Sequence, residues 1–200
     1  MLNLEPYTPV IGPVVEVVVT LFLKWKESGK RDAHSSFHEI FEPAFNELLI
    51  IHKDYIDMFQ KTSQLLFDSE MADEGKFLES LRDAAAFLER RRTELEPERM
   101  ELRALAKELA YDPSRESAFV RAVATYLSAW PPDSVGTASV GLLARIEAIA
   151  KQPSVTPSEL AAMLVQLDVH INQLTQRQRD CWAQVCETFA PLKVRAGKSG

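Results

Sequence analysis

The chain has 200 residues, of which 46% are hydrophobic and 26% are charged, and its formal net charge is −6. These values describe a globular protein that can form a core without disulfides or metals, rather than a disordered or fibrous chain. The acidic balance argues against a nucleic-acid binder, whose affinity for phosphates depends on clustered Lys and Arg. Cys181 and Cys186 are five residues apart and would point to different sides of a helix, so we expect no disulfide.

The first predicted element is the apolar segment 10–25, VIGPVVEVVVTLFLKW. Its valines favour a strand, but the sequence offers no second strand to pair with it, so we predict a helix that begins near Pro9 or Pro13 and ends at about Ser28. A bilayer span takes about twenty apolar residues. The segment is shorter and carries Glu16 near its middle, which disfavours a membrane span.

This apolar helix is expected to be buried on or in a helical bundle, or to be exposed to a protein partner or an anionic membrane. Cations and an aromatic residue directly after an apolar run suit a membrane interface. The candidate partner- or membrane-binding residues are Val14, Val18, Leu21, Phe22, Lys24, Trp25 and Lys26. No basic region precedes the segment, so we expect no secretory signal and a cytoplasmic protein, with peripheral membrane association as an alternative.

A second helix is predicted from a capping box at Ser36 and Glu39 to about Phe67, with a wide apolar stripe along it. Pro43 lacks the backbone donor of an interior helical residue, so it should kink this helix or restart it. His52 falls on the apolar stripe and is expected at the core or its rim.

Arg31 precedes His38 with six residues between them in an all-helical chain. This spacing resembles the Arg-x4-6-His pattern of HEPN-type ribonucleases, and the resemblance covers these two residues only. It implies a helical active site with Arg31 and His38 as catalytic residues, although Arg31 precedes the predicted helix cap. The alternative for His38 is an ion pair with Glu42, one helical turn away. No histidine and cysteine cluster has zinc-ligand spacing, so we expect neither a metal nor a cofactor.

Three further helices are predicted before the longest irregular loop. The first carries Phe77 to Leu88, the second opens at Pro97 or continues the first as a bent rod, and the third starts at Asp112-Pro113. Five arginines in this region alternate with glutamates, which predicts a solvated, salt-bridged face. They are Arg90, Arg91, Arg92, Arg99 and Arg103. We expect residues 1–200 to form a single helical-bundle domain, and the loop 130–138 is the boundary if this domain has two sub-lobes.

A short helix around residues 142–149 precedes a clear helix start at Thr156, where proline follows at the first helical position and Glu159 completes a capping box. From Leu160 to Thr188 the apolar residues recur at near-heptad spacing, and His170 lies beside this line. The last residues, 190–200, are basic and are expected to form a flexible tail.

Together these elements predict an all-α fold, an elongated antiparallel bundle of about six to seven helices with the apolar N-terminal helix packed on or in it. No nucleophile motif or phosphate-binding loop is present, so the chain is expected to be a non-catalytic interaction or regulatory module that binds a protein partner or itself. A membrane-acting helical effector is the first alternative, and a HEPN-like ribonuclease is the second. We identify no nucleic-acid partner and no small-molecule substrate.

Overall fold

The computed structural model is all-helical throughout the residues that it describes. These are residues 11–28, 32–70, 74–93, 96–128, 142–152 and 156–199. The elements in chain order are α1 (Ile11–Glu27), α2 (Ala33–Ser36), the π-helical turn η1 (Phe37–Phe41), α3 (Glu42–Glu70), α4 (Glu74–Thr93), α5 (Glu96–Glu108), α6 (Arg115–Ser128), α7 (Leu142–Ala150) and α8 (Pro157–Ser199).

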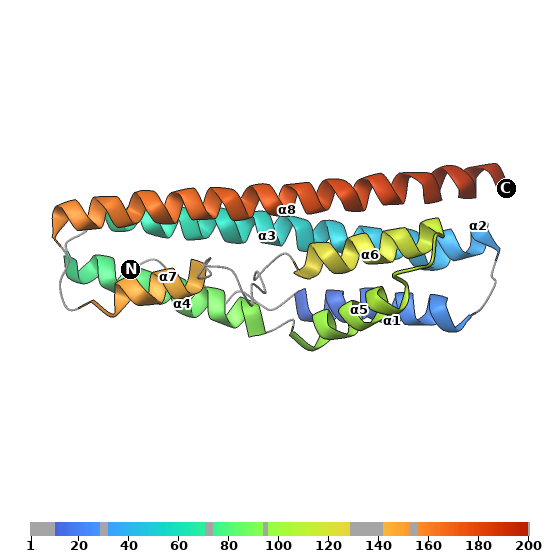
Figure 1. The fold of residues 1–200 in the computed structure, drawn as a ribbon, viewed down its shortest axis with the longest axis horizontal. Helices are drawn as coiled ribbons and strands as arrows, with labels where there is room; N and C mark the ends of the chain where they lie inside the picture. The colour runs from blue at the N-terminus through green and yellow to red at the C-terminus, as the bar shows by residue number, and fades with distance from the viewer. Residues whose placement is uncertain are drawn as a thin grey trace.

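The two longest helices, α3 and α8, lie antiparallel and run along the length of the molecule (Figure 1). At one end α1 packs against α3, α6 packs against α8, and α5 packs against α1 and α6. At the other end α4 packs against α3, and α7 packs against α8 and α4. The two long helices alone would leave part of their apolar surfaces exposed. The shorter helices complete the core at each end, because the apolar stripe of each one covers part of that surface. The predicted elongated antiparallel bundle is therefore confirmed.

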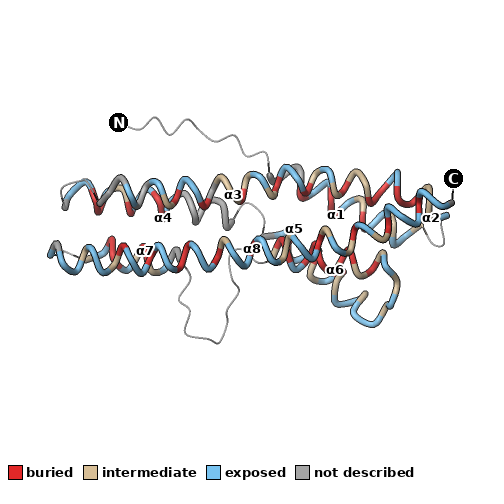
Figure 2. The backbone as a smooth tube through the Cα atoms, turned by 90° about the horizontal axis from the view of Figure 1, so that it is seen from above, coloured by how far each residue is buried: buried red, intermediate tan, exposed pale blue. Residues whose placement is uncertain are grey.

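The apolar N-terminal segment forms α1 and packs in this bundle against α3, η1 and α5. Val15, Val18 and Phe22 are fully buried, whereas Glu16 and Val17 on the opposite side are exposed. Figure 2 shows such buried positions recurring along the helices. The helical period of 3.6 residues separates these two sides, so the valine-rich run is accommodated as a helix with one buried face.

The helical path from α2 to α3 begins earlier than predicted. Asp32 is the N-cap, and the backbone N–H of Ser35 donates to its carboxylate at 3.2 Å. Ser36 makes no side-chain cap hydrogen bond and is buried inside the path, so the predicted capping box at Ser36 and Glu39 is wrong. Asp32 caps the helix first because its short carboxylate reaches the free donors of the first turn.

Pro43 does not end the helical path. The preceding turn widens into the π-helix η1, in which the N–H of Glu42 donates to the carbonyl of Phe37, five residues back. Such a turn relieves the crowding that a proline ring causes against the preceding turn of an α-helix. It also places Phe37, Ile40 and Phe41 in the core.

The capping box predicted at Thr156 and Glu159 is confirmed at the start of α8, and α6 begins at Arg115, shortly after the start predicted at Asp112-Pro113. Before α6, the Asp112 carboxylate accepts hydrogen bonds from the Ser114 backbone N–H at 2.9 Å and from the Ser117 hydroxyl at 2.6 Å. Before α8, the N–H of Thr156 donates to Glu159 at 3.0 Å and the N–H of Glu159 donates to the Thr156 hydroxyl at 3.3 Å. These reciprocal bonds satisfy backbone donors that have no partner within the helix.

The near-heptad line of α8 is buried or half-buried along its length, and the helix extends further than expected. The tail predicted at 190–200 is helical through Ser199, although Pro191 lies inside it. Leu192 and Ala196 are buried, and Arg195 forms a 3.0 Å ion pair with Glu116 of α6. These contacts offset the roughly 3 kcal/mol that a proline costs inside a helix. The proposed boundary at 130–138 lies outside the described residues.

The burial of α1 generates a test of the core. Substitution of Phe22 by alanine should lower the free energy of unfolding by about 3 kcal/mol or more, because a fully buried ring leaves a cavity. The neighbouring Leu23→Ala variant is the matched control. Leu23 is exposed, so this change should alter stability by less than about 0.5 kcal/mol. Chemical denaturation of both variants measures the difference, and equal effects would contradict the burial of α1.

Candidate functional site

Four rings from two helices form a continuous stack along the line where α3 and α8 meet. Phe189 and Phe45 lie nearly parallel with ring centroids 4.0 Å apart, and Phe45 and Trp182 follow at 5.6 Å. His52 then stacks on Trp182 at 4.4 Å with an interplanar angle of 9°. The rings alternate between α8 and α3, so each one lies against a ring of the other helix.

The sequence explains this alternation. Phe45 and His52 are seven residues apart on α3, and Trp182 and Phe189 are seven residues apart on α8. Seven residues make about two helical turns, so each pair lies on one side of its helix. Because α3 and α8 are antiparallel, the two pairs interleave.

The outer edge of this stack is open to solvent. Phe45, His52 and Trp182 are half-buried, and Leu49, which lies between Phe45 and His52 on the same side of α3, is 46% exposed. The exposed Arg179 precedes Trp182 by one helical turn on α8. We call these five residues the aromatic seam. They form a partly exposed apolar strip with a cation at its edge.

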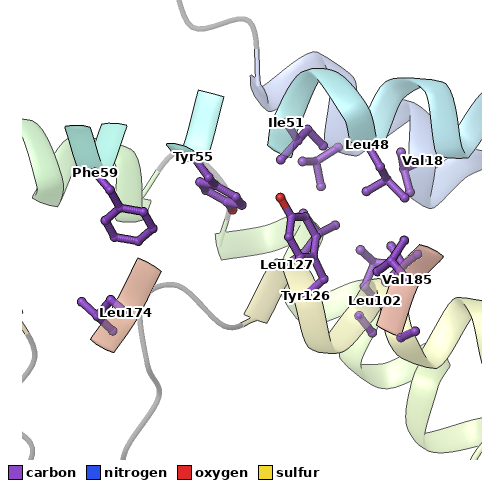
Figure 3. Close-up of a cluster of buried hydrophobic side chains, with 14 of the residues drawn as sticks. Val18, Leu48, Ile51, Tyr55, Phe59, Leu102, Tyr126, Leu127, Leu174 and Val185 are labelled. Atoms are coloured by element: carbon purple, nitrogen blue, oxygen red, sulfur yellow. The ribbon is translucent and has the colours of Figure 1, made fainter. Parts of the chain in front are cut away.

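The inner edge of the seam is polar. The Nδ1 atom of His52 lies 3.1 Å from the hydroxyl oxygen of Tyr126, a fully buried residue of α6. Figure 3 shows the Tyr126 ring standing between the helices, with its hydroxyl directed toward the α3 residues Ile51 and Tyr55. Gln178 of α8 is also buried beside this hydroxyl. The Tyr126 hydroxyl thus lies between His52 of α3 and Gln178 of α8.

The environment of the seam shifts the pKa values of its groups in a consistent direction. Burial lowers the pKa of His52, and the positive charge of Arg179 lowers it further. Burial raises the pKa of Tyr126, and a hydrogen bond with the Gln178 side chain opposes that rise. Burial also raises the pKa of the Cys181 thiol. At neutral pH all three side chains are therefore uncharged, which suits a packed interface and not a thiolate nucleophile.

His170 occupies a similar place near the other end of α8, as the sequence predicted. Its side chain is buried, and its Nε2 atom has no hydrogen-bond partner among the described residues. Burial lowers the pKa of this imidazole, as does the charge of Arg145 on α7, while a hydrogen bond with Gln173 raises it. Lowered pKa values keep both His52 and His170 neutral at neutral pH, and the two residues belong to different helices, α3 and α8.

The structure separates the predicted partner- or membrane-binding residues of α1. Val18 and Phe22 are in the core, and Leu21 and Trp25 are half-buried, with Trp25 edge-on to Phe41 at 5.5 Å. Lys24 and Lys26 are exposed, and Lys26 pairs with Glu108 at the end of α5. The side chain of Val14 lies outside the described residues. The apolar and cationic members therefore do not share one exposed face.

The predicted ribonuclease pair is described only in part. Arg31 lies outside the described residues, and His38 is exposed with its Nδ1 atom 2.8 Å from a carboxylate oxygen of Glu42. This is the ion-pair geometry that the sequence offered as the alternative for His38. The pairing of Arg31 with His38 stays a prediction.

The predicted solvated arginine face is wrong at Arg99, which is 1% exposed. Arg99 precedes Leu102 by one helical turn, on the core side of α5, so the packing of this helix decides its burial. Arg103 is half-buried and donates from Nε to the Ser128 hydroxyl at 3.0 Å. The side chains of Arg90, Arg91 and Arg92 are outside the described residues.

Searches of the described residues for two other kinds of site give negative results. No helix among them is long and apolar enough to cross a membrane, and no cluster of three or more His, Cys, Asp or Glu side chains among them has the arrangement of a metal site. Comparisons of the chain with family models, with curated proteins and with solved structures find no match. The candidate site therefore rests on its geometry.

Sequence reasoning missed the aromatic seam because it followed the fully buried stripes. The sequence places His52 on the apolar stripe of the second predicted helix, and no local pattern distinguishes Trp182 from the other residues of α8. The available signal was the pair of seven-residue spacings on the two longest helices. These spacings indicate interleaved rings only if α3 and α8 are antiparallel neighbours. Neither spacing alone can establish that arrangement.

The buried phenol gives a second prediction. The Tyr126→Phe variant keeps the ring but removes the hydroxyl, so His52 loses its hydrogen-bond partner on α6. We expect the free energy of unfolding to fall by about 1 kcal/mol, the usual value of such a bond. The control is Tyr111→Phe, at a phenol that is 98% exposed, which should leave stability unchanged. Equal stability of Tyr126→Phe and the wild type would contradict the bond.

His170 gives a prediction for pH. Because burial lowers its pKa in the folded state, the unfolded chain binds protons more readily below about pH 6.5. The contribution of His170 to stability is therefore fully present above that pH and is lost as the pH falls toward the folded-state pKa. Denaturation of wild type and His170→Gln across this range should show a weaker pH dependence in the variant. Parallel curves would contradict the assignment.

Proposed function

We propose that the protein is a non-catalytic helical interaction module of the cytoplasm, and that it binds a helix of a protein partner along the aromatic seam. The observation that carries the proposal is the partly exposed ring stack between α3 and α8. Tryptophan and other large aromatic side chains are enriched among the residues that dominate binding energy at protein interfaces.

The shape of the seam favours a helical partner. Grooves between two packed helices recur as docking sites for amphipathic helices, which insert apolar side chains spaced by three, four and seven residues. The rings of Phe45 and Trp182 and the side chain of Leu49 offer an apolar strip of that kind, with Arg179 at its edge. We infer a partner helix with an apolar stripe and an acidic residue placed to meet Arg179.

The burial of α1 gives less support to the membrane-acting alternative. Insertion of α1 into lipid would require Val18 and Phe22 to leave the core, where both are fully buried. Binding at the seam requires no such rearrangement, because Leu49 and the outer ring edges are already accessible. A second copy of the chain is one partner that this proposal covers.

Site-specific photo-crosslinking in cells tests the proposal with a matched pair of positions. A photoreactive amino acid replaces Leu49 in one variant and Ile50 in the other. The two residues are neighbours on α3 with similar exposure, 46% and 48%, but Ile50 points away from Phe45 and His52. The seam predicts a discrete adduct from position 49 that position 50 does not give, and Trp182→Ala should weaken it.

Adduct size distinguishes the two kinds of protein partner, because a second copy gives a product of twice the mass of the chain. The same adducts from both positions, or none from position 49 under conditions where the protein is folded, would contradict the proposed binding surface. Circular dichroism of each purified variant establishes that it retains its helices.

A further inference from the structure

His52 is the one member of the aromatic seam that changes charge near neutral pH, since an unperturbed imidazole titrates near pH 6.5. It occupies the junction of three helices. Its backbone belongs to α3, its Nδ1 atom meets the Tyr126 hydroxyl of α6 at 3.1 Å, and its ring lies flat on Trp182 of α8 at 4.4 Å. A change at this imidazole therefore acts on all three helices.

We propose that His52 is a pH-sensitive latch of the aromatic seam: the neutral imidazole joins α3 to α6 through Tyr126 and supports Trp182, and its protonation releases Trp182 from the stack. In the neutral tautomer that carries its proton on Nε2, Nδ1 accepts the hydrogen bond of the Tyr126 hydroxyl. In the protonated form both ring nitrogens are donors, so the hydroxyl must turn its proton elsewhere.

The surroundings oppose the charge. Arg179 of α8 acts on His52 as a like charge, and the half-buried position removes part of the water that would solvate an imidazolium. The other titratable groups around the His52–Tyr126 pair are Cys181 on α8 and Asp54 and Tyr55 on α3. Asp54 adds its negative charge to the surroundings of Tyr126, where it disfavours the phenolate and keeps the hydroxyl neutral.

One interaction favours the charged form. An imidazolium above the face of Trp182 gains a cation–π attraction of roughly 0.5–1 kcal/mol at a partly exposed site. Burial and the charge of Arg179 act in the opposite direction, and both lower the pKa of His52. The imidazolium of His52 regains its hydration when its ring leaves the stack. One face of the Trp182 indole then loses its stacking partner.

Fluorotryptophan NMR of the full chain tests the latch. The chain has three tryptophans, so the Trp182 signal is identified by its loss in Trp182→Phe. In the wild type, the Trp182 signal should move as the pH falls, with a midpoint below about 6.5. In His52→Phe, which retains an aromatic ring but cannot titrate, the signal should stay constant over the same range.

Two further variants make the result specific. Arg179→Gln removes the like charge at an exposed position, so the midpoint should rise toward the ordinary histidine value. His38→Gln replaces an exposed histidine whose Nδ1 atom meets Glu42 and not Tyr126, so it should leave the wild-type response unchanged. A constant Trp182 signal in the wild type, an unchanged response in His52→Phe, or an unmoved midpoint in Arg179→Gln would overturn the latch.

An effect of pH on partner binding would rest on the proposed function, because it requires the aromatic seam to be the binding surface. The NMR titration uses the isolated protein and requires no partner. Loss of the crosslink at position 49 with an intact titration would remove the proposed function alone, and the reverse result would remove the latch alone.

Discussion

The antiparallel packing of α3 against α8 is the interaction on which the rest of the bundle depends. Their rings interleave from Phe189 to His52, and this contact fixes the register of the two longest helices. With that register set, α1, α5 and α6 can complete the core at one end, and α4 and α7 at the other. Neither end has a complete core without both long helices, because each short helix covers only one side.

The same contact joins stability to the candidate function. The inner side of the stack meets the buried hydroxyl of Tyr126, and the outer side leaves Leu49 and the edges of Phe45 and Trp182 accessible. Aromatic residues serve both roles well, because they bury large apolar areas while offering a flat face or edge to a partner. The apolar helix α1 supplies Val18 and Phe22 to the core.

Local signals predicted much of the fold. The Thr156–Glu159 capping box, the helix start near Asp112-Pro113 and the heptad line of α8 are local in sequence and act within single helices, so they could be recognised without tertiary information. Features that depend on packing between helices could not. The burial of Arg99, the continuation of α8 past Pro191 and the pairing of His52 with Trp182 each require a neighbouring helix to be in place.

A double-mutant cycle between Phe45 and Trp182 tests the central role of the α3–α8 stack most directly. Their rings lie 5.6 Å apart on different helices, so a direct contact should give a coupling free energy of about 0.5–1.5 kcal/mol when both are replaced by alanine. The sum of the two single losses of stability should therefore exceed the loss in the double variant by this amount. Strictly additive losses would contradict the stack.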